Sequence, residues 1–401
     1  MTEYWIWLSL AMHGASIKTD ELINKFSNPK NVFENRESIF KGKYPVLESD
    51  HKRMMNKELD SAYYIMEKAK EQNVKILTPD SPDFPECFRE IYGVPLALFV
   101  KGDTQLLSDP LKATVVGARR PTEYSVAATY RLTYDLAKAG VTIVSGCAMG
   151  IDYVAHRAAL NAGGKTIAFL ASGIDVDYPT NHNPLKKEIL EKGTIVTEYP
   201  FGMEADPSHF APRNRLIAAS SLGTIVTQAG ERSGALLTAN HASEQGKDVY
   251  AIPDSIFNSK AVGSLKLVKD GAYLITNSSD FLMNYIHLFP ERMQLDKIPE
   301  HTDFLQIKDD LFEKAIKHRY TGTPIKPSVE KDDCGAFVPL VENASETAKK
   351  IYNFLLNGPA DLDSISAELG VDTTIVYSEV TLLELEECIA QKNDMFYIPK
   401  M

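Results

Sequence analysis

Apolar and polar positions follow two alternating patterns in the middle of the chain. Short apolar runs rich in β-branched residues predict strands, and the segments between them carry apolar residues at helical spacing. Alternating strands and helices with mostly apolar strands are typical of a doubly wound, mostly parallel α/β sheet covered on both faces. The predicted strands cover residues 96–102, 112–117, 141–145, 165–171, 194–199, 223–228 and 248–253, and the predicted helices cover 125–140, 151–163, 185–193, 213–221 and 234–246.

The flanking regions have different patterns. Residues 1–74 show helical periodicity with short breaks and predict a small helical domain, whose second helix we expect Thr19 and Asp20 to cap. Residues 287–340 are charged and contain prolines, which predicts a linker with one helix near 310–318. Residues 341–401 predict three helices and then a two-stranded wing, the order of a winged helix. The sheet itself is assigned to residues 75–286.

Composition narrows the class of protein. A chain of 401 residues exceeds one ordinary core, and its 44% hydrophobic and 24% charged content is ordinary for a soluble globular protein. The apolar runs are too short to cross a membrane, and the N-terminus lacks the features of a signal peptide. The four cysteines are scattered, which argues against a zinc site or a disulfide framework. We therefore expect a cytoplasmic protein with no metal, no cofactor and no membrane partner.

Charge is unevenly distributed. The net charge of −11 argues against nucleic acid, but residues 111–285 hold 17 basic and 16 acidic side chains, whereas residues 286–401 hold 12 and 21. The middle of the chain is therefore nearly neutral, and its basic residues cluster in the loops that follow predicted strands. A local positive pocket on an acidic body is compatible with this distribution.

Four loops carry the candidate chemistry. The first strand of the alternating region ends at Gly117, where the chain can turn sharply and project Arg119 and Arg120 toward an anion. The loop containing Gly146 opens a helix whose N–H groups and dipole favour an anion. For each arginine the alternative is an ion pair with a surface carboxylate. The second and third glycines of a dinucleotide-binding loop are absent after Gly117, so a bound dinucleotide is not expected.

The other two loops add further donors. Arg213, Asn214 and Arg215 are predicted to begin a helix after Pro212, and one of the two arginines is expected to work inside the fold. Arg232, Ser233 and Gly234 precede another helix, with Ser233 as its N-cap. The carboxyl ends of parallel strands meet at one edge of the sheet, so these loops predict one polyanion-binding pocket there.

A catalytic interpretation is weaker. Asp152 and His156 lie four residues apart on one predicted helix face, but no serine or cysteine nucleophile at a strained turn accompanies them. A capping aspartate and a structural histidine account for the pair more simply. We therefore expect a binding protein, not an enzyme, with no catalytic residue.

In their order, these motifs resemble the DNA-processing protein A family, also called DprA or Smf. The matching residues are Gly117–Arg119, Ser145–Leu160, Tyr178–Pro179, Arg213–Arg215 and Ser233–Ala239. The flanks resemble the family's sterile-alpha-motif-like domain, its extended Rossmann-fold lead-in and its winged helix. The chain departs from the family pattern at Cys147, at Gln228, where glutamate is usual, and at Asp254, where glycine is usual.

The resemblance implies a non-enzymatic DNA-binding protein. Family members bind and protect single-stranded DNA, form homodimers through the Rossmann domain and help to load the RecA recombinase during natural transformation of competent cells. Other competence or single-strand-binding proteins are further expected partners. The resemblance implies that the DNA pocket involves Arg119, the Gly146 loop and the loop from Arg232 to Gly234.

The alternative is a nucleotide-binding or nucleotide-hydrolysing enzyme. Lysine-decarboxylase-like Rossmann proteins bind or hydrolyse nucleotides and carry a PGGxGTxxE loop with a catalytic glutamate. The equivalent stretch here contains Glu231 but neither the double glycine nor the GTxxE ending.

The predicted winged helix has an unusual charge. Residues 341–401 hold four lysines, no arginine and eleven acidic residues, and the helix expected to read DNA has no basic residue. A helix in the major groove needs hydrogen-bond donors and a cationic face near phosphates. We therefore predict that this module binds no duplex DNA by itself and contacts protein.

Overall fold

The computed structural model describes residues 1–39, 46–56, 58–299, 345–356, 360–385, 388–392 and 395–398. The chain divides into two compact units, Met1–Arg319 and Tyr320–Met401. Most of the predicted linker, including the helix expected near residues 310–318, lies outside the described residues. Its first part does not behave as a linker: Met293 is buried, and Phe289, Leu295 and Ile298 pack against the core of the sheet. The domain that contains the sheet therefore extends at least to Ile298.

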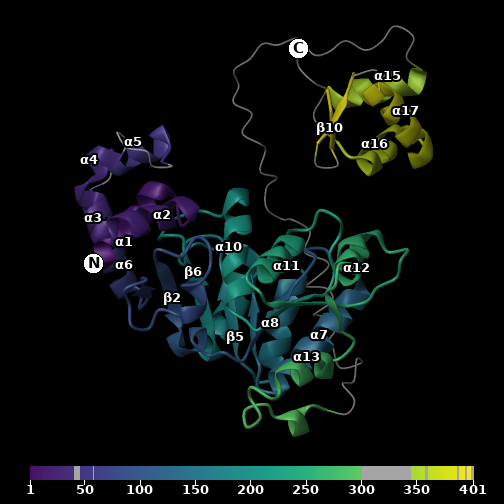
Figure 1. Cartoon of the computed structure of the whole chain (residues 1–401). Helices are drawn as coiled ribbons and strands as arrows, with labels where there is room; N and C mark the ends of the chain where they lie inside the picture. The colour runs from purple at the N-terminus through teal and green to yellow at the C-terminus, as the bar shows by residue number, and fades with distance from the viewer. Residues whose placement is uncertain are drawn as a thin grey trace. The chain divides into compact units, whose positions relative to one another are not determined.

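The first unit is built on one nine-stranded sheet in the order β1-β2-β6-β5-β4-β3-β7-β8-β9 (Figure 1). β1 and β2 pair antiparallel with each other, and β2 pairs antiparallel with β6, while all other pairs are parallel. This arrangement confirms the mostly parallel α/β class. The strands are β1 (Lys75–Leu77), β2 (Leu98–Gly102), β3 (Lys112–Val116), β4 (Thr142–Ser145), β5 (Thr166–Phe169), β6 (Thr194–Thr197), β7 (Gly223–Val226), β8 (Asp248–Ala251) and β9 (Tyr273–Leu274).

The chain reverses its direction of travel across the sheet beside β3. From β3 it proceeds through β4 and β5 to β6, and it then returns to β7 on the other side of β3. Val116 at the end of β3 is in register with Val226 at the end of β7. Crossovers leave this point in opposite directions, so the loops after β3 and β7 separate and leave a crevice at the carboxyl ends of the strands.

Helices cover both faces of the sheet because successive strand residues point in opposite directions. Val116 and Val226 pack with Ile217 and Ala239 from helices α10 and α11 on one face. On the other face, the adjacent strand residues Val115 and Ile225 pack with α7, α8 and α13. The α-helices described between β3 and the end of the sheet domain are α7 (Glu123–Lys138), α8 (Ile151–Asn161), α9 (Asn183–Lys192), α10 (Pro207–Ala219), α11 (Gly234–Glu244), α12 (Val262–Lys269) and α13 (Ser278–Tyr285).

The N-terminal region is helical, as expected, and packs around Trp7 and Leu8. Two contacts tie it to the segment that leads into the sheet. The indole Nε1 of Trp5 donates to Asp80 at 2.7 Å, and the Asp20 carboxylate accepts the N–H groups of Gly93 and Val94 at 2.6 and 3.1 Å. The helices are α1 (Thr2–Met12), α2 (Ile17–Phe26), α3 (Pro29–Glu34), α4 (Arg36–Ile39), α5 (Glu48–Asn56) and α6 (Asp60–Glu71).

The predicted cap of α2 was wrong in detail. Ser16 is the N-cap, and the Thr19 hydroxyl closes a capping box by accepting the N–H of Ser16 at 2.9 Å. Asp20 lies inside the helix, so its carboxylate is available to bind the segment at Gly93.

The described residues of the second unit form three helices followed by a hairpin, the order that the sequence predicts for residues 341–401. Its core includes Ile351, Ile365 and Val380, one from each helix. The assignment of this order to a winged helix stays a prediction. The elements are α15 (Glu346–Leu355), α16 (Leu362–Leu369), α17 (Thr373–Leu385), β10 (Ala390–Lys392) and β11 (Met395–Tyr397). In the described parts of the chain, every helix is too short or too polar to cross a membrane.

Candidate functional site

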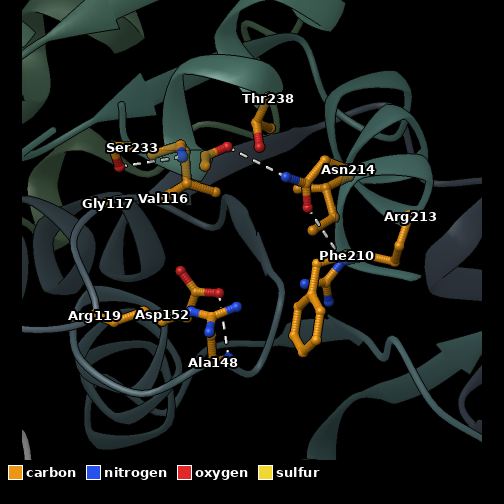
Figure 2. Close-up of a pocket in the computed structure, with 13 residues that line it drawn as sticks. Val116, Gly117, Arg119, Ala148, Asp152, Phe210, Arg213, Asn214, Ser233 and Thr238 are labelled. Atoms are coloured by element: carbon orange, nitrogen blue, oxygen red, sulfur yellow. Dashed lines mark hydrogen bonds between the residues drawn. The ribbon is translucent and has the colours of Figure 1, made fainter. Parts of the chain in front are cut away.

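A pocket of about 310 Å³ opens at the reversal point beside β3 (Figure 2). Its walls come from the end of β3 and the loop after it, the loop and helix after β4, and helices α10 and α11. This is the position where an open parallel sheet leaves room for a ligand. The lining residues are Val116, Gly117, Arg119, Ala148, Asp152, Phe210, Arg213, Asn214, Ile217, Ser233, Gly234, Ala235 and Thr238.

The loop that carries Arg119 is held against the start of α8. The Ala118 carbonyl accepts the N–H of Ile151 at 3.2 Å. Gly150, with φ of +80°, makes this approach possible, because a Cβ atom there would lie 2.4 Å from the Ala118 oxygen. The backbone beside Arg119 is therefore fixed, while its side chain remains exposed.

Arg119 and Phe210 form a cation–π pair inside the pocket. The guanidinium carbon lies 4.6 Å from the centroid of the Phe210 ring, and Tyr178 contacts the same ring edge-on at 5.9 Å between centroids. Figure 2 shows Arg119 and Phe210 on opposite sides of the pocket's lower half, with the ring facing the cavity. A planar cation beside an aromatic ring can receive a phosphate and a base together.

The opposite wall is the first turn of α11. Ser233 is its N-cap, and the Ser233 hydroxyl accepts the N–H of Ala235 at 3.3 Å. Asn214 on α10 donates through Nδ2 to the Gly234 carbonyl at 3.3 Å and so holds the two helices together. The positive end of the α11 dipole therefore faces the cavity, as an anion site requires.

Arg213 forms the buried floor of the pocket. Its Nη1 donates to the carbonyls of Gly146, at 2.8 Å, and Phe169, while Nε donates to Asn214 at 3.2 Å. These bonds join α10 to the loop after β4 and to the end of β5. Burial lowers the pKa of the Arg213 guanidinium, and the Asp152 carboxylate opposes that shift. Arg213 therefore has a structural role, and its charge also contributes to the positive electrostatic potential of the pocket.

In the loop at Gly146, two backbone N–H groups already donate hydrogen bonds within the protein. The Asp152 Oδ2 accepts the N–H groups of Gly146 at 3.1 Å and Ala148 at 3.2 Å. Burial raises the pKa of the Asp152 carboxyl, while Arg213 and these N–H groups act in the opposite direction. Gly146 does not line the pocket. A Cβ atom there would lie 2.8 Å from both Arg213 Nη2 and Asp152 Oδ2, so its lack of a side chain makes room for these two residues.

Arg215 does not line the pocket either. It is buried against Glu198, with Nη2 2.7 Å from Glu198 Oε1, and it also donates to the Gly93 carbonyl at 2.7 Å. The Glu198 contacts raise the pKa of the Arg215 guanidinium against the effect of burial. We therefore assign Arg215 to holding α10 on the sheet and on the segment bound by Asp20, and both arginines of the pair are internal.

The start of α10 also differs from the prediction. The helix begins at Pro207 after the N-cap Asp206, whose Oδ1 accepts the N–H of Ser208 at 2.8 Å. Pro212 lies inside the helix. The additional helical residues at this end include Phe210, and they place its ring in the pocket.

Arg120 and Arg232 are exposed beside the pocket without lining it. None of the ion pairs among the described residues involves Arg119, Arg120 or Arg232. Glu123 and Glu231 are exposed in the neighbouring sequence, so the positive character is local to the rim. The alternative that each arginine pairs with a carboxylate is therefore not observed in the described parts.

The possible catalytic groups are buried and held. The His156 Nδ1 lies 2.7 Å from the Thr166 hydroxyl, which donates to the Ile143 carbonyl, so Nδ1 carries the proton. Burial lowers the pKa of His156 to about 3, and burial raises the pKa of the Cys147 thiol to about 12. Within the described ranges, no cluster of His, Cys, Asp or Glu side chains is arranged to hold a metal ion.

Six of the residues that the sequence predicts for the site line this pocket, namely Gly117, Arg119, Arg213, Asn214, Ser233 and Gly234. Phe210 and Thr238 also line it and were not predicted. Phe210 stands just before the Arg213–Arg215 motif, and an aromatic residue next to a basic motif is the signal that could have identified it. Thr238 carries no comparable signal, because a threonine in a helix has many structural uses.

Comparison with known proteins gives consistent matches. The family model described as "DNA recombination-mediator protein A" matches residues 75–286. Protein Smf from Synechocystis is 31% identical over 340 residues, which cover 84% of this chain and 82% of the relative. DNA processing protein DprA from Bacillus subtilis is 38% identical over 211 residues, covering 53% and 71%. The X-ray structure of DprA from Streptococcus pneumoniae has a TM-score of 0.61 at 31% identity, covering 71% of this chain and 98% of that structure.

Proposed function

The chain belongs to the DNA recombination-mediator protein A family, and we propose that it binds single-stranded DNA in the pocket beside β3. The observation that best supports this function is the exposed guanidinium of Arg119 over the Phe210 ring, next to the N-terminus of α11. A cation and a helix N-terminus suit the phosphates, and the ring suits a base.

The geometry favours a single strand over a duplex. In a duplex the faces of the bases are covered by their neighbours, whereas in a single strand they are accessible to an aromatic ring. The Phe210 ring lines a pocket of about 310 Å³ instead of lying on a flat surface.

We propose that the site binds without catalysing a reaction. A general base needs a pKa near the working pH and access to substrate, and His156 has neither. Cys147 is buried and its pKa is raised, so it is a poor nucleophile. In the competing nucleotide-hydrolase hypothesis Glu231 would act on the substrate, but Glu231 does not line the pocket. Release of base from nucleoside monophosphates would favour that hypothesis.

We also propose a role in recombination, in which the protein helps to load the RecA recombinase on DNA during natural transformation. The family description, which names a recombination mediator, supports this role.

We propose a homodimer formed through the Rossmann domain at the edge strand β9. Tyr273 and Leu274 there are 52% and 51% exposed, and an edge strand with apolar residues can pair with a second copy. If a Tyr273→Lys variant had the particle mass of a monomer where the wild type has that of a dimer, the result would support that interface. A cytoplasmic location stays a prediction.

Fluorescence anisotropy with single- and double-stranded oligonucleotides of one sequence tests the DNA-binding function. We expect tighter binding of the single strand, and a loss of affinity of about tenfold with Arg119→Ala. The slope of log affinity against log salt should fall by about one unit. Arg232→Ala should have a smaller effect, because Arg232 lies outside the pocket. Lys187→Ala removes one exposed charge from α9 and serves as the control. Unchanged affinity of Arg119→Ala would contradict the proposal.

A further inference from the structure

The loop between β8 and α12 holds two large apolar side chains in solvent. Ile256 is 80% exposed and Phe257 is 90% exposed. Side chains with so much exposed surface contribute little to the stability of the fold. An exposed apolar pair of this size therefore points to an interaction with another molecule.

Hydrogen bonds fix the conformation of this loop, which we call the rim loop (residues 254–260). The Asp254 carboxylate accepts from the Ser255 N–H at 2.6 Å and from Asn258 Nδ2 at 2.9 Å. The N–H of Phe257 donates to the Ser255 hydroxyl at 3.2 Å, and the N–H of Asn258 donates to the Ser255 carbonyl at 3.0 Å. These hydrogen bonds hold the turn in a conformation that leaves the two apolar side chains exposed to solvent.

The rim loop adjoins the two segments that build the pocket beside β3. Lys260 Nζ lies 3.4 Å from the Arg120 carbonyl, next to Arg119 in sequence. Gln228 Nε2 lies 3.4 Å from Asp254 Oδ2, and the N–H of Gly263 donates to the Ala229 carbonyl at 2.8 Å. Gln228 and Ala229 precede the loop of Ser233. The rim loop is therefore continuous with the mouth of the pocket.

Gln228 and Asp254 are also two of the positions where the sequence departs from the family pattern. The departures contact each other, and Gln228 additionally accepts the N–H of Thr122 at 3.0 Å. A glycine in place of Asp254 could not accept the bonds from Ser255 and Asn258. The conformation that exposes Phe257 therefore depends on the Asp254 carboxylate.

We propose that the rim loop is a second contact for single-stranded DNA, in which Phe257 stacks on a base and Lys260 binds a phosphate outside the pocket. The inference rests on the proposed function of the pocket. The exposed side chains of Arg120 and Lys260 on the rim match the charge of a phosphate backbone. An aromatic side chain beside cations is the usual platform for a single strand, and it needs no particular base.

Oligonucleotide length separates the two contacts. A short oligothymidylate of about 4 nucleotides should fill the pocket alone, and one of about 16 should also reach the rim loop. We expect Phe257→Ala to weaken binding of the long oligonucleotide about tenfold and to leave the short one unchanged. Arg119→Ala should weaken both. Tyr92→Ala removes another exposed aromatic residue, 81% exposed, and is the matched control.

A second readout reports the contact directly. In a Phe257→Trp variant, the added indole should retain long-oligonucleotide affinity, and its fluorescence should be quenched by the long oligonucleotide more than by the short one. If Arg119→Ala weakens binding but Phe257→Ala leaves the affinity for both oligonucleotides unchanged, the rim-loop inference is overturned and the proposed binding in the pocket is kept. If Arg119→Ala leaves the affinity for both oligonucleotides unchanged, the proposed binding in the pocket is itself contradicted. If Phe257→Ala instead halves the particle mass in light scattering, the loop is a contact between copies of the chain and the inference is overturned.

Discussion

The guanidinium carbon of Arg119 lies 4.6 Å from the centroid of the Phe210 ring, although Arg119 follows strand β3 and Phe210 belongs to helix α10. The two segments meet because the crossover from β6 back to β7 places α10 over the carboxyl end of β3. A cation held beside an aromatic ring needs little rearrangement to receive a phosphate and a base together.

The first prediction concerns this pair. Phe210→Ala should weaken single-strand binding by about 1–3 kcal/mol, because one stacked base loses its partner. Because each side chain orients the other, the double variant Arg119→Ala with Phe210→Ala should lose less than the sum of the two single losses. A double-mutant cycle by anisotropy measures this coupling, and Phe210→Tyr is the conservative control. Strict additivity would mean that the two side chains act independently.

The second prediction separates a structural arginine from a binding one. Removing Glu198 leaves the buried Arg215 guanidinium without its carboxylate, so Glu198→Ala should lower the free energy of unfolding by about 3–5 kcal/mol. Chemical denaturation measures the loss. DNA affinity of the folded protein should change less than twofold. A variant that kept its stability and lost DNA affinity would place this pair in the binding site after all.

The third prediction follows from the neutral state of His156. Its pKa in the folded protein is about 3, against an ordinary value of 6.5, so between these values the unfolded chain binds a proton that the folded chain does not. Stability from this residue is complete above pH 6.5 and is lost as the pH falls toward 3. Lowering the pH from about 7.5 to about 5.5 should cost about 1.4 kcal/mol through His156.

Denaturation of wild type and His156→Asn at both pH values measures this contribution. The asparagine amide can still donate to the Thr166 hydroxyl but does not titrate in this range. The loss on acidification should therefore be smaller in the variant by about 1.4 kcal/mol. An equal loss in both proteins would show that His156 is protonated in the folded state.

The fourth prediction concerns the second unit. Helix α17 exposes Ile375 and Tyr377, at 51% and 60%, and its sequence has no basic residue. A surface of this kind lacks the cationic side chains that bind phosphates. Residues 341–401, which have their own core, should therefore show no duplex binding tighter than about 100 µM at physiological salt. Micromolar or tighter binding in a gel shift would contradict the interpretation that this unit contacts protein.

The sheet and most of the pocket could be predicted because strand and helix periodicities are local. Apolar runs, small residues at strand ends and N-cap residues such as Ser233 are visible in short windows of sequence. The order of the motifs then placed Arg119 and Ser233 at one edge, because carboxyl ends of parallel strands converge.

The remaining features depend on contacts between distant segments. Arg213 and Arg215 are both arginines on one helix, and only the positions of Gly146 and Glu198 show that both are internal. Phe210 enters the pocket because α10 begins at Pro207, and the second proline, Pro212, concealed that start. The occupied amides of the Gly146 loop likewise depend on the direction of the Asp152 carboxylate, which a sequence pattern does not specify.

Photo-crosslinking tests the central claim most directly. A single-stranded oligonucleotide with a photoreactive thymidine analogue, irradiated on the intact protein and mapped by mass spectrometry, should attach to peptides that contain Phe210 or Arg119. Unlabelled single strand should compete for the crosslink, and Arg119→Ala should reduce it. Crosslinks confined to helices α1–α6 or to residues 345–398 would contradict the account, because the strand would then be bound away from the sheet edge beside β3.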